Sequence, residues 1–217
     1  MISLNAQTLP VKSCWALVPV KCFALAKQRL APLFDNAVSP IHCSRAAFAA
    51  AMLADLLEAL QASKNIHGVL LVTGETSLES HIPASFNKQL LIESETGIGL
   101  NSSVSQGIAT LQARGVEQCV VLPADIPLCS GESIDAVIEQ HRLFAAASEA
   151  PGISVLEAAS AGGTNALIFS PDNKFQPAFG EGSFKRHIEN AQNAGFSTLS
   201  LSADKLALDI DQPEQVV

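Results

Sequence analysis

The chain alternates short apolar runs with longer amphipathic segments, and this alternation restricts its fold more than any other feature of the sequence. Four apolar runs have the length of buried strands: 15–20, 69–72, 90–92 and 119–122. Three longer segments are expected to be helices: 45–62, 101–114 and 132–146. They show either helical spacing of apolar residues or residues typical of helix starts and ends. Strands that alternate with helices usually pair in parallel, so we expect a mainly parallel sheet with helices on both faces.

The rest of the chain continues the pattern. Strand-like segments recur at 153–156, 165–169 and 198–201, and a helical segment starts near Ser183 and ends before Gly195. Pro213 suits the first turn of a short terminal helix. No repeat or linker interrupts the sequence. We therefore predict one α/β domain over residues 1–217, a three-layer sandwich with a mainly parallel mixed sheet.

Composition and charge narrow the classes of function. The chain is 48% hydrophobic with a net charge of −8, which indicates a compact protein with no general attraction for nucleic acid or an anionic membrane. Any anionic substrate therefore needs a local basic pocket. Residues 1–13 lack the apolar stretch of a secretory signal, and the apolar run 15–20 is too short to span a bilayer. We expect a cytoplasmic protein without nucleic-acid or membrane partners, and a homodimer is left open.

Cysteine usage agrees with a cytoplasmic protein. The five cysteines are scattered and form no C-x-x-C pair, so the sequence indicates neither a zinc site nor a redox motif. We expect reduced, mostly buried thiols at the five positions Cys14, Cys22, Cys43, Cys119 and Cys129.

Ligands of such sheets bind at the carboxyl ends of the strands, and four polar clusters occupy such positions in this sequence. The first cluster is basic. Pro19 and Lys21 stand at the end of the first strand, and Lys27 and Arg29 follow in the next loop. The lysine ammonium groups can attract the charge of a polyphosphate, and the Arg29 guanidinium can donate two parallel hydrogen bonds to it. A solvated basic loop is the alternative.

The second cluster is the glycine-containing loop 95–99 and the start of the helix that follows. Gly99 allows backbone N–H groups to approach a ligand closely, and Asn101 can read a base edge or a ribose. Capping of the helix by the side chains at 101–103 is the alternative. A dinucleotide fingerprint does not fit, because Ser102 occupies the third glycine position and the loop does not follow the first strand. This argues against a Rossmann dehydrogenase.

The third cluster is acidic. Asp125 stands at the end of the fourth strand, and Asp209 and Asp211 follow a short apolar run near the C-terminus. Mg²⁺ prefers hard oxygen ligands and typically binds through one or two carboxylates plus phosphate oxygens. Alternate residues of an extended segment point to the same side, so Asp209 and Asp211 suit a metal as well as a helix cap. For Asp125, a turn-forming role is the alternative.

The fourth cluster consists of two glycine-rich turns. One turn, 162–163, precedes Thr164, and the other, 179–182, leads into a helix on which Ser183 and His187 are about one turn apart. Backbone N–H groups and hydroxyls in such turns can bind a phosphate or a carboxylate. Two ordinary glycine turns with a structural His187 are the alternative.

Taken in this order, the clusters resemble the family of 2-phospho-L-lactate, phosphoenolpyruvate and 3-phospho-D-glycerate guanylyltransferases, which serve the biosynthesis of the deazaflavin coenzyme F-420. The matching stretches span nearly the whole chain: 18–21, 26–30, 99–101, 123–127, 163–167, 179–183 with His187, and 209–213. Two residues depart from the pattern. Ile126 stands where the family usually has Leu, and Glu181 adds a negative charge to the substrate turn, which leaves the identity of the acid open.

The resemblance implies a Rossmann-like, GT-A-type nucleotidyltransferase fold and an enzyme that uses GTP and Mg²⁺. It also implies roles for residues of all four clusters. Those roles are catalysis by Lys21, Lys27, Arg29 and Asp125; nucleotide binding by Pro19, Lys21, Gly99, Asn101 and Asp125; acid binding by Thr164, Gly180, Ser183 and His187; and metal binding by Asp125, Asp209 and Asp211.

The implied reaction is attack of a phosphate oxygen of the acid on the α-phosphorus of GTP, which releases pyrophosphate. Catalysis would come from positioning and charge neutralisation. One alternative is a molybdopterin- or sugar-phosphate-type nucleotidyltransferase; these normally carry a glycine-rich loop after the first strand, and residues 21–29 contain no Gly. The other alternative is a non-catalytic nucleotide-binding module, which would bind GTP without releasing pyrophosphate.

Overall fold

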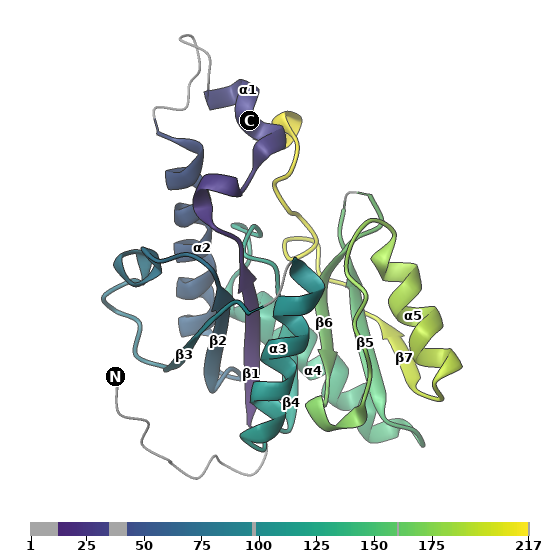
Figure 1. Cartoon of the computed structure of the whole chain (residues 1–217). Coiled ribbons are helices and arrows are strands. Elements are labelled where there is room, and N and C mark those ends of the chain that lie inside the picture. The colour runs from purple at the N-terminus through teal and green to yellow at the C-terminus, as the bar shows by residue number, and fades with distance from the viewer. Residues whose placement is uncertain (1–12, 35–42, 97–98, 160, 217) are drawn as a thin grey trace.

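A computed structural model describes residues 13–34, 43–96, 99–159 and 161–216. They form a seven-stranded sheet with the strand order β3-β2-β1-β4-β6-β5-β7 (Figure 1). The strands are β1 (Cys14–Val20), β2 (Gly68–Thr73), β3 (Gln89–Ser94), β4 (Gln118–Val121), β5 (Gly152–Glu157), β6 (Thr164–Phe169) and β7 (Ser197–Ser200). Strand β6 runs antiparallel to β4 and β5, and the other neighbouring pairs are parallel. The prediction of a mainly parallel mixed sheet is confirmed.

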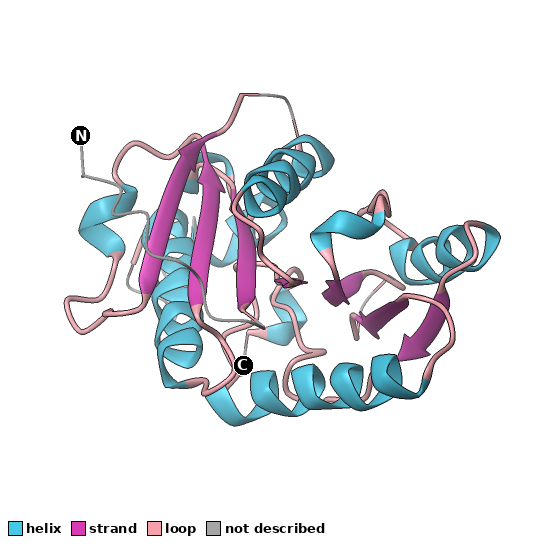
Figure 2. Cartoon of the chain, turned by 90° about the horizontal axis from the view of Figure 1, so that it is seen from below, coloured by secondary structure: helices cyan, strands magenta, loops and turns pink. Residues whose placement is uncertain are grey.

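Helices cover both faces of this sheet (Figure 2). Helices α2 (Arg45–Ala62) and α4 (Gly131–Ala147) pack on one face, and α3 (Leu100–Ala113) and α5 (Ser183–Asn193) pack on the other. The shorter elements are α1 (Ala31–Phe34) and the 3-10 turns Phe23–Leu25, Gln28–Leu30, Leu78–His81, Pro171–Asn173 and Pro213–Gln215. The predicted three-layer sandwich is confirmed, and Pro213 opens the short terminal turn as expected.

Strand β1 explains why both faces need a cover. Successive side chains of a strand point to opposite faces of its sheet. Ala16 and Val18 belong to the core against α2 and α4, whereas Trp15 and Leu17 belong to the core against α3 and α5. All four side chains are fully buried. A strand buried on both faces is an unbroken apolar run, which is the pattern that the sequence displays.

The helix ends follow local capping signals, with one exception. Ser44 caps α2 by accepting the N–H of Ala47, as predicted, and Ser130 caps α4. The prediction that side chains at 101–103 cap α3 is wrong, because these residues lie within the helix and Gly99 takes the N-cap position. The backbone of Gly99, with φ 89° and ψ 166°, adopts a conformation that is essentially restricted to glycine.

The expectation of mostly buried cysteines holds for only two of them. Cys14 and Cys119 are buried in strands, and burial raises the pKa of Cys14 to about 12. Cys22 and Cys129 are partly exposed and Cys43 is exposed, because all three lie in loops. All five are free thiols.

Two sets of sequence predictions fall outside the described residues. They concern residues 1–12 and the positions Gly97 and Ile98 of the glycine-containing loop. Within the ranges that the structure describes, no helix has both the length and the apolar character needed to cross a membrane.

Candidate active site

Two neighbouring cavities lie where the carboxyl ends of β1 and β4 meet the start of β6. A cavity of about 290 Å³ is lined by the basic loop, including Pro19, Lys21 and Lys27. A cavity of about 510 Å³ is lined by the glycine-rich turns and the C-terminal segment, including Arg29, Thr164, Gly180, Ser183 and Asp209. Asp125 and Asp211 line both cavities. The site therefore offers two binding spaces that share a pair of carboxylates.

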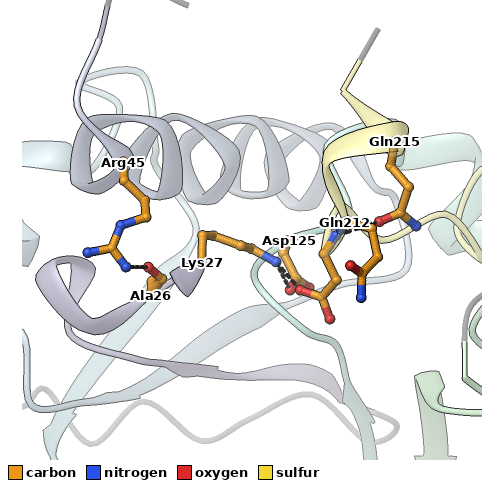
Figure 3. A network of polar contacts seen from close by, with 7 residues as sticks. Ala26, Lys27, Arg45, Asp125, Gln212 and Gln215 are labelled. Atoms are coloured by element: carbon orange, nitrogen blue, oxygen red, sulfur yellow. Dashed lines mark hydrogen bonds and ion pairs between the residues drawn. The ribbon is translucent and has the colours of Figure 1, made fainter. Parts of the chain in front are cut away.

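Lys27 links the two carboxylates. Its Nζ donates a hydrogen bond to Oδ2 of Asp125 and another to Oδ1 of Asp211 at 2.7 Å (Figure 3). The Lys27 side chain is only 7% exposed, whereas those of Asp125 and Asp211 are 25% and 42% exposed. The backbone of Lys27 is left-handed, with φ 53° and ψ 39°, a conformation that is costly for a residue with a Cβ.

The electrostatics of this cluster favour an additional cation. Burial raises the pKa of Asp125, the Lys27 ammonium opposes this shift, and the carboxylates of Asp211 and Asp209 add to it. Burial alone would lower the pKa of Lys27, but its two carboxylate partners reverse the effect and hold that pKa above its ordinary value. Lys27 therefore stays charged, and Asp125 sits in a field to which several carboxylates contribute.

The C-terminal segment reaches this site through long-range backbone contacts. The N–H of Ile210 donates to the carbonyl of Asp125 at 3.1 Å, which places the residues on either side of Ile210 next to Asp125. Asn165, buried in β6, donates its Nδ2 to the carbonyls of Ala207 at 2.8 Å and Leu206 at 3.2 Å. Asn165 was not among the predicted site residues, although an amide within an otherwise apolar strand is a visible signal.

The basic loop is also fixed by residues that the sequence analysis missed. Arg45 donates from its guanidinium to the carbonyls of Ala26 at 2.7 Å and Ala24 at 3.1 Å. Glu75 accepts the N–H of Phe23 at 2.9 Å. A positive charge in the first turn of a helix opposes the helix dipole, so the position of Arg45 at the start of α2 was an available signal. No local signal marks Glu75.

The predicted basic residues come together as expected from their spacing. Lys21, Lys27 and Arg29 line a third cavity of about 320 Å³ beside the first two, and Asp211 also lines it. Lys21 and Arg29 are exposed. Two flexible cations are therefore available at the mouth of the site, and one buried ammonium is held at its centre.

The predicted nucleotide contacts at the start of α3 have a different setting. Asn101 donates from Nδ2 to the carbonyl of Phe179 at 3.1 Å, and its Oδ1 accepts the N–H of Phe179 at 2.7 Å. Its amide thus joins α3 to the second glycine-rich turn. Leu100, between Gly99 and Asn101, lines both main cavities. Contacts of Gly99 and Asn101 with a nucleotide stay predictions.

Three of the four predicted acid-binding residues, Thr164, Ser183 and His187, form one buried group, and the fourth, Gly180, is exposed. Thr164 Oγ1 lies 2.9 Å from Ser183 Oγ and 3.1 Å from His187 Nδ1. Thr164 and Ser183 line the larger cavity together with Gly180 and Glu181. His187 is fully buried behind the two hydroxyls, so in this structure it reaches the cavity through Thr164.

The donor set fits Mg²⁺ bound together with a phosphate ligand. Among the described residues, no three His, Cys, Asp or Glu side chains converge closely enough to hold a metal by themselves. Asp125 and Asp211 nevertheless converge on one positive charge, the Lys27 ammonium, and Asp209 lines the same cavity. Mg²⁺ needs only one or two protein carboxylates where phosphate oxygens and water complete its shell.

Because two histidines are buried, we expect the folded protein to lose stability in mild acid. Burial is the main cause that lowers the pKa of His141 and of His187 to about 4. The unfolded chain takes up these protons near pH 6.5 and the folded chain only near pH 4, so lowering the pH through this window favours unfolding. We expect a loss of about 2 kcal/mol per histidine between pH 7 and pH 5, measurable by denaturant titration. A free energy of unfolding that stayed constant between pH 7 and pH 5 would contradict the conclusion that both buried imidazoles are neutral in the folded protein.

Comparison with known proteins agrees with this geometry. Residues 14–217 match the family described as "Guanylyl transferase CofC like". The chain is 31% identical over 198 residues to a phosphoenolpyruvate guanylyltransferase of Sphaerobacter thermophilus, covering 91% of this chain and 88% of that protein. It is 31% identical over 208 residues to a 3-phospho-D-glycerate guanylyltransferase of Phenylobacterium zucineum, covering 93% and 87%.

A solved structure supports the same fold. The 4-diphosphocytidyl-2C-methyl-D-erythritol synthase of Anaerococcus prevotii matches with a TM-score of 0.63 at 11% identity, covering 94% of this chain and 93% of that one. This likeness supports the GT-A-like nucleotidyltransferase architecture alone. The family match, by contrast, includes every strand of the sheet and each of the clusters that line the cavities. The chain belongs to the family of CofC-like guanylyl transferases.

Proposed function

We propose that this protein is a guanylyltransferase that condenses GTP with a three-carbon phospho-acid. The acid would be phosphoenolpyruvate, 3-phospho-D-glycerate or 2-phospho-L-lactate, and the products a GMP-linked diphosphate and pyrophosphate, as a step of coenzyme F-420 biosynthesis. The observation that carries this proposal is that two cavities share Asp125 and Asp211. A reaction that joins two phosphorylated substrates is accelerated when both are held next to each other at one site.

The lining residues divide between the two substrates. Lys21 and Lys27, beside the smaller cavity, suit the phosphates of GTP, whereas Thr164, Gly180 and Ser183, in the larger cavity, suit the acid. Each group holds its substrate beside the shared carboxylates. Proximity alone can account for much of the acceleration of such a two-substrate reaction.

In the proposed reaction, a phosphate oxygen of the acid forms a bond to the α-phosphorus of GTP. The bond from that phosphorus to the bridging oxygen of the β-phosphate breaks, and pyrophosphate leaves with the electron pair. A phosphate dianion is already nucleophilic near neutral pH, so the protein supplies position and charge instead of a base. Asp125, with Asp209 and Asp211, would hold Mg²⁺, which neutralises phosphate charge when bound.

The identity of the acid is left open by Glu181. This residue lines the acid cavity and places a carboxylate near an anionic substrate, so experiment must identify the acid. The cytoplasmic location stays a prediction, and a homodimer is left open.

Pyrophosphate release provides the test. The protein is incubated with GTP and Mg²⁺ and with each of the three acids in turn, and each product is identified by mass. We expect one acid to drive release at least about tenfold above the reaction without acid, because that acid supplies the nucleophile. Replacing GTP by CTP or ATP measures nucleotide preference. GTP binding without acid-dependent release would instead support a nucleotide-binding module, and release driven by a sugar phosphate would support the other alternative.

A further inference from the structure

Behind the wall of the larger cavity, three side chains and one backbone group form a continuous hydrogen-bonded chain. The N–H of Ala178 donates to Nε2 of His187 at 2.8 Å, and Nδ1 of His187 lies 3.1 Å from Thr164 Oγ1. Thr164 Oγ1 in turn lies 2.9 Å from Ser183 Oγ. His187 is fully buried, and Ser183 and Thr164 are 1% and 8% exposed. These hydrogen bonds therefore run from the half-buried Ala178 through the fully buried His187 to the two hydroxyls at the cavity.

The first link of this chain fixes the tautomer of His187. A backbone N–H can only donate, so Nε2, which accepts from Ala178, carries no proton. Burial and the neighbouring Arg186 charge lower the pKa of His187 to about 4, so the ring is neutral at physiological pH. The proton of a neutral imidazole must then lie on Nδ1, and the tautomer is assigned from its partner. Nδ1 consequently donates to Thr164.

The tautomer of His187 determines how many hydroxyl protons are free to face the cavity. Thr164 Oγ1 accepts a hydrogen bond from His187, so its own proton is not used toward the ring. Thr164 and Ser183 together then have two hydroxyl protons, and the hydrogen bond between them uses only one. One proton fills it, and the other remains to be donated into the cavity. With the opposite tautomer, Thr164 would donate to His187 and Ser183 would donate to Thr164. Only lone pairs would then face the cavity.

We propose that His187 is a positioning residue that acts through Thr164 to keep one hydroxyl proton directed into the cavity, so that this wall donates a hydrogen bond to an anionic ligand. The proposal rests on the proposed function for the identity of that ligand, the phospho-acid. A further donor strengthens anion binding here, because the same cavity is lined by the carboxylates of Glu181 and Asp209, which repel an anion, as well as by Arg29, which attracts it.

Two replacements of His187 separate its two hydrogen bonds. In His187→Asn the amide lies near the position of Nδ1 and can still donate to Thr164. In His187→Gln the amide reaches toward the position of Nε2 and can accept from Ala178 but offers Thr164 no donor. We expect His187→Gln to raise KM for the acid by up to about tenfold, because Thr164 loses the donor that orients its hydroxyl although both hydroxyl protons remain, with KM for GTP unchanged. His187→Asn should recover most of that loss.

His141 provides a matched control. It is also buried, and its Nδ1 lies 2.8 Å from Ser154 Oγ, but it lies on α4 and lines neither of the two main cavities. His141→Gln should lower the free energy of unfolding without changing KM for the acid. If His187→Gln and His187→Asn raise this KM equally, or if His141→Gln raises it as well, the positioning role is wrong.

The ring tautomer can be measured without turnover. Nitrogen chemical shifts of the histidine rings in the wild-type protein, with the His187 signals identified by their loss in His187→Asn, should show Nδ1 protonated and Nε2 unprotonated. A proton on Nε2 would overturn the proposal. Should the wild type release no pyrophosphate with any acid, the proposed function fails. The tautomer, together with inorganic phosphate binding to the wild type and to His187→Gln measured by calorimetry, then decides the role of His187 separately.

Discussion

Asp125→Asn is expected to lower kcat for acid-dependent pyrophosphate release by about 10³-fold or more while leaving the protein folded. Asn has nearly the same shape as Asp, and the contact of the Asp125 carbonyl with Ile210 uses the backbone, which the substitution preserves. What disappears is the negative charge that both cavities share. Turnover is measured with the acid that drives release, and folding is measured by thermal unfolding.

Asp204→Asn is the matched control for this variant. Asp204 is an exposed carboxylate in the same C-terminal segment as Asp209 and lies outside the lining of the two main cavities. It should behave like the wild type. Raising the Mg²⁺ concentration should restore part of the activity of Asp125→Asn if the remaining carboxylates still hold the cation. A fully active Asp125→Asn protein would remove Asp125 from the proposed metal site.

The sequence predicted the layers of the fold because burial on both faces leaves a direct pattern. Segments such as 15–20 and 69–72 are apolar throughout, and the helix 45–62 has the predicted bounds. The N-cap of α3 was mispredicted, because the side chains at 101–103 are common capping residues. Capping preference favoured a side-chain cap at these positions, whereas in the structure Gly99 takes the N-cap position with a backbone conformation that suits glycine.

The residues alone predicted four clusters at the carboxyl ends of strands, and the resemblance joined them in one reaction, but the contacts between them were not predicted. Lys27 and Asp211 are separated by 184 positions in the sequence and share a hydrogen bond in the structure. Contacts of this range depend on the strand order, which no periodicity reveals. Glu75, which holds the backbone of Phe23, was missed for the same reason, whereas Arg45 and Asn165 carried local signals whose backbone partners the sequence does not reveal. Charged and glycine-rich motifs are therefore easier to predict from a sequence than the side chains that hold those motifs in place.

Lys27 combines a strained backbone with a charged side chain at the centre of the site. A left-handed residue with a Cβ costs about 1–2 kcal/mol, and such strain persists where the surroundings determine it strongly. Around Lys27, the surroundings are Arg45 on the preceding carbonyl and the two carboxylates on the ammonium. Glycine would adopt this backbone more cheaply. The residue present instead carries an ammonium to the carboxylates that both cavities share.

Lys27→Ala and Lys27→Gly are expected to lose turnover equally but to differ in stability. Both remove the ammonium, so kcat should fall by about 10²-fold or more in each, because the charge that faces the phosphates and Asp125 is gone. Both also leave Asp125 and Asp211 without their shared partner, which affects the two variants alike. The free energy of unfolding should be up to about 1 kcal/mol higher for Lys27→Gly, because only the alanine has a Cβ in the left-handed region.

The comparison of these two variants isolates the backbone from the charge. Denaturant titration gives the difference in stability, and pyrophosphate release gives the common loss of turnover. Equal stabilities would mean that the chain relaxes out of the left-handed conformation once the ammonium is absent, so that the hydrogen bonds to Asp125 and Asp211 impose the strain. Retained turnover in both variants would remove the Lys27 ammonium from the proposed reaction and leave Lys21 and Arg29 as the cations that face the phosphates.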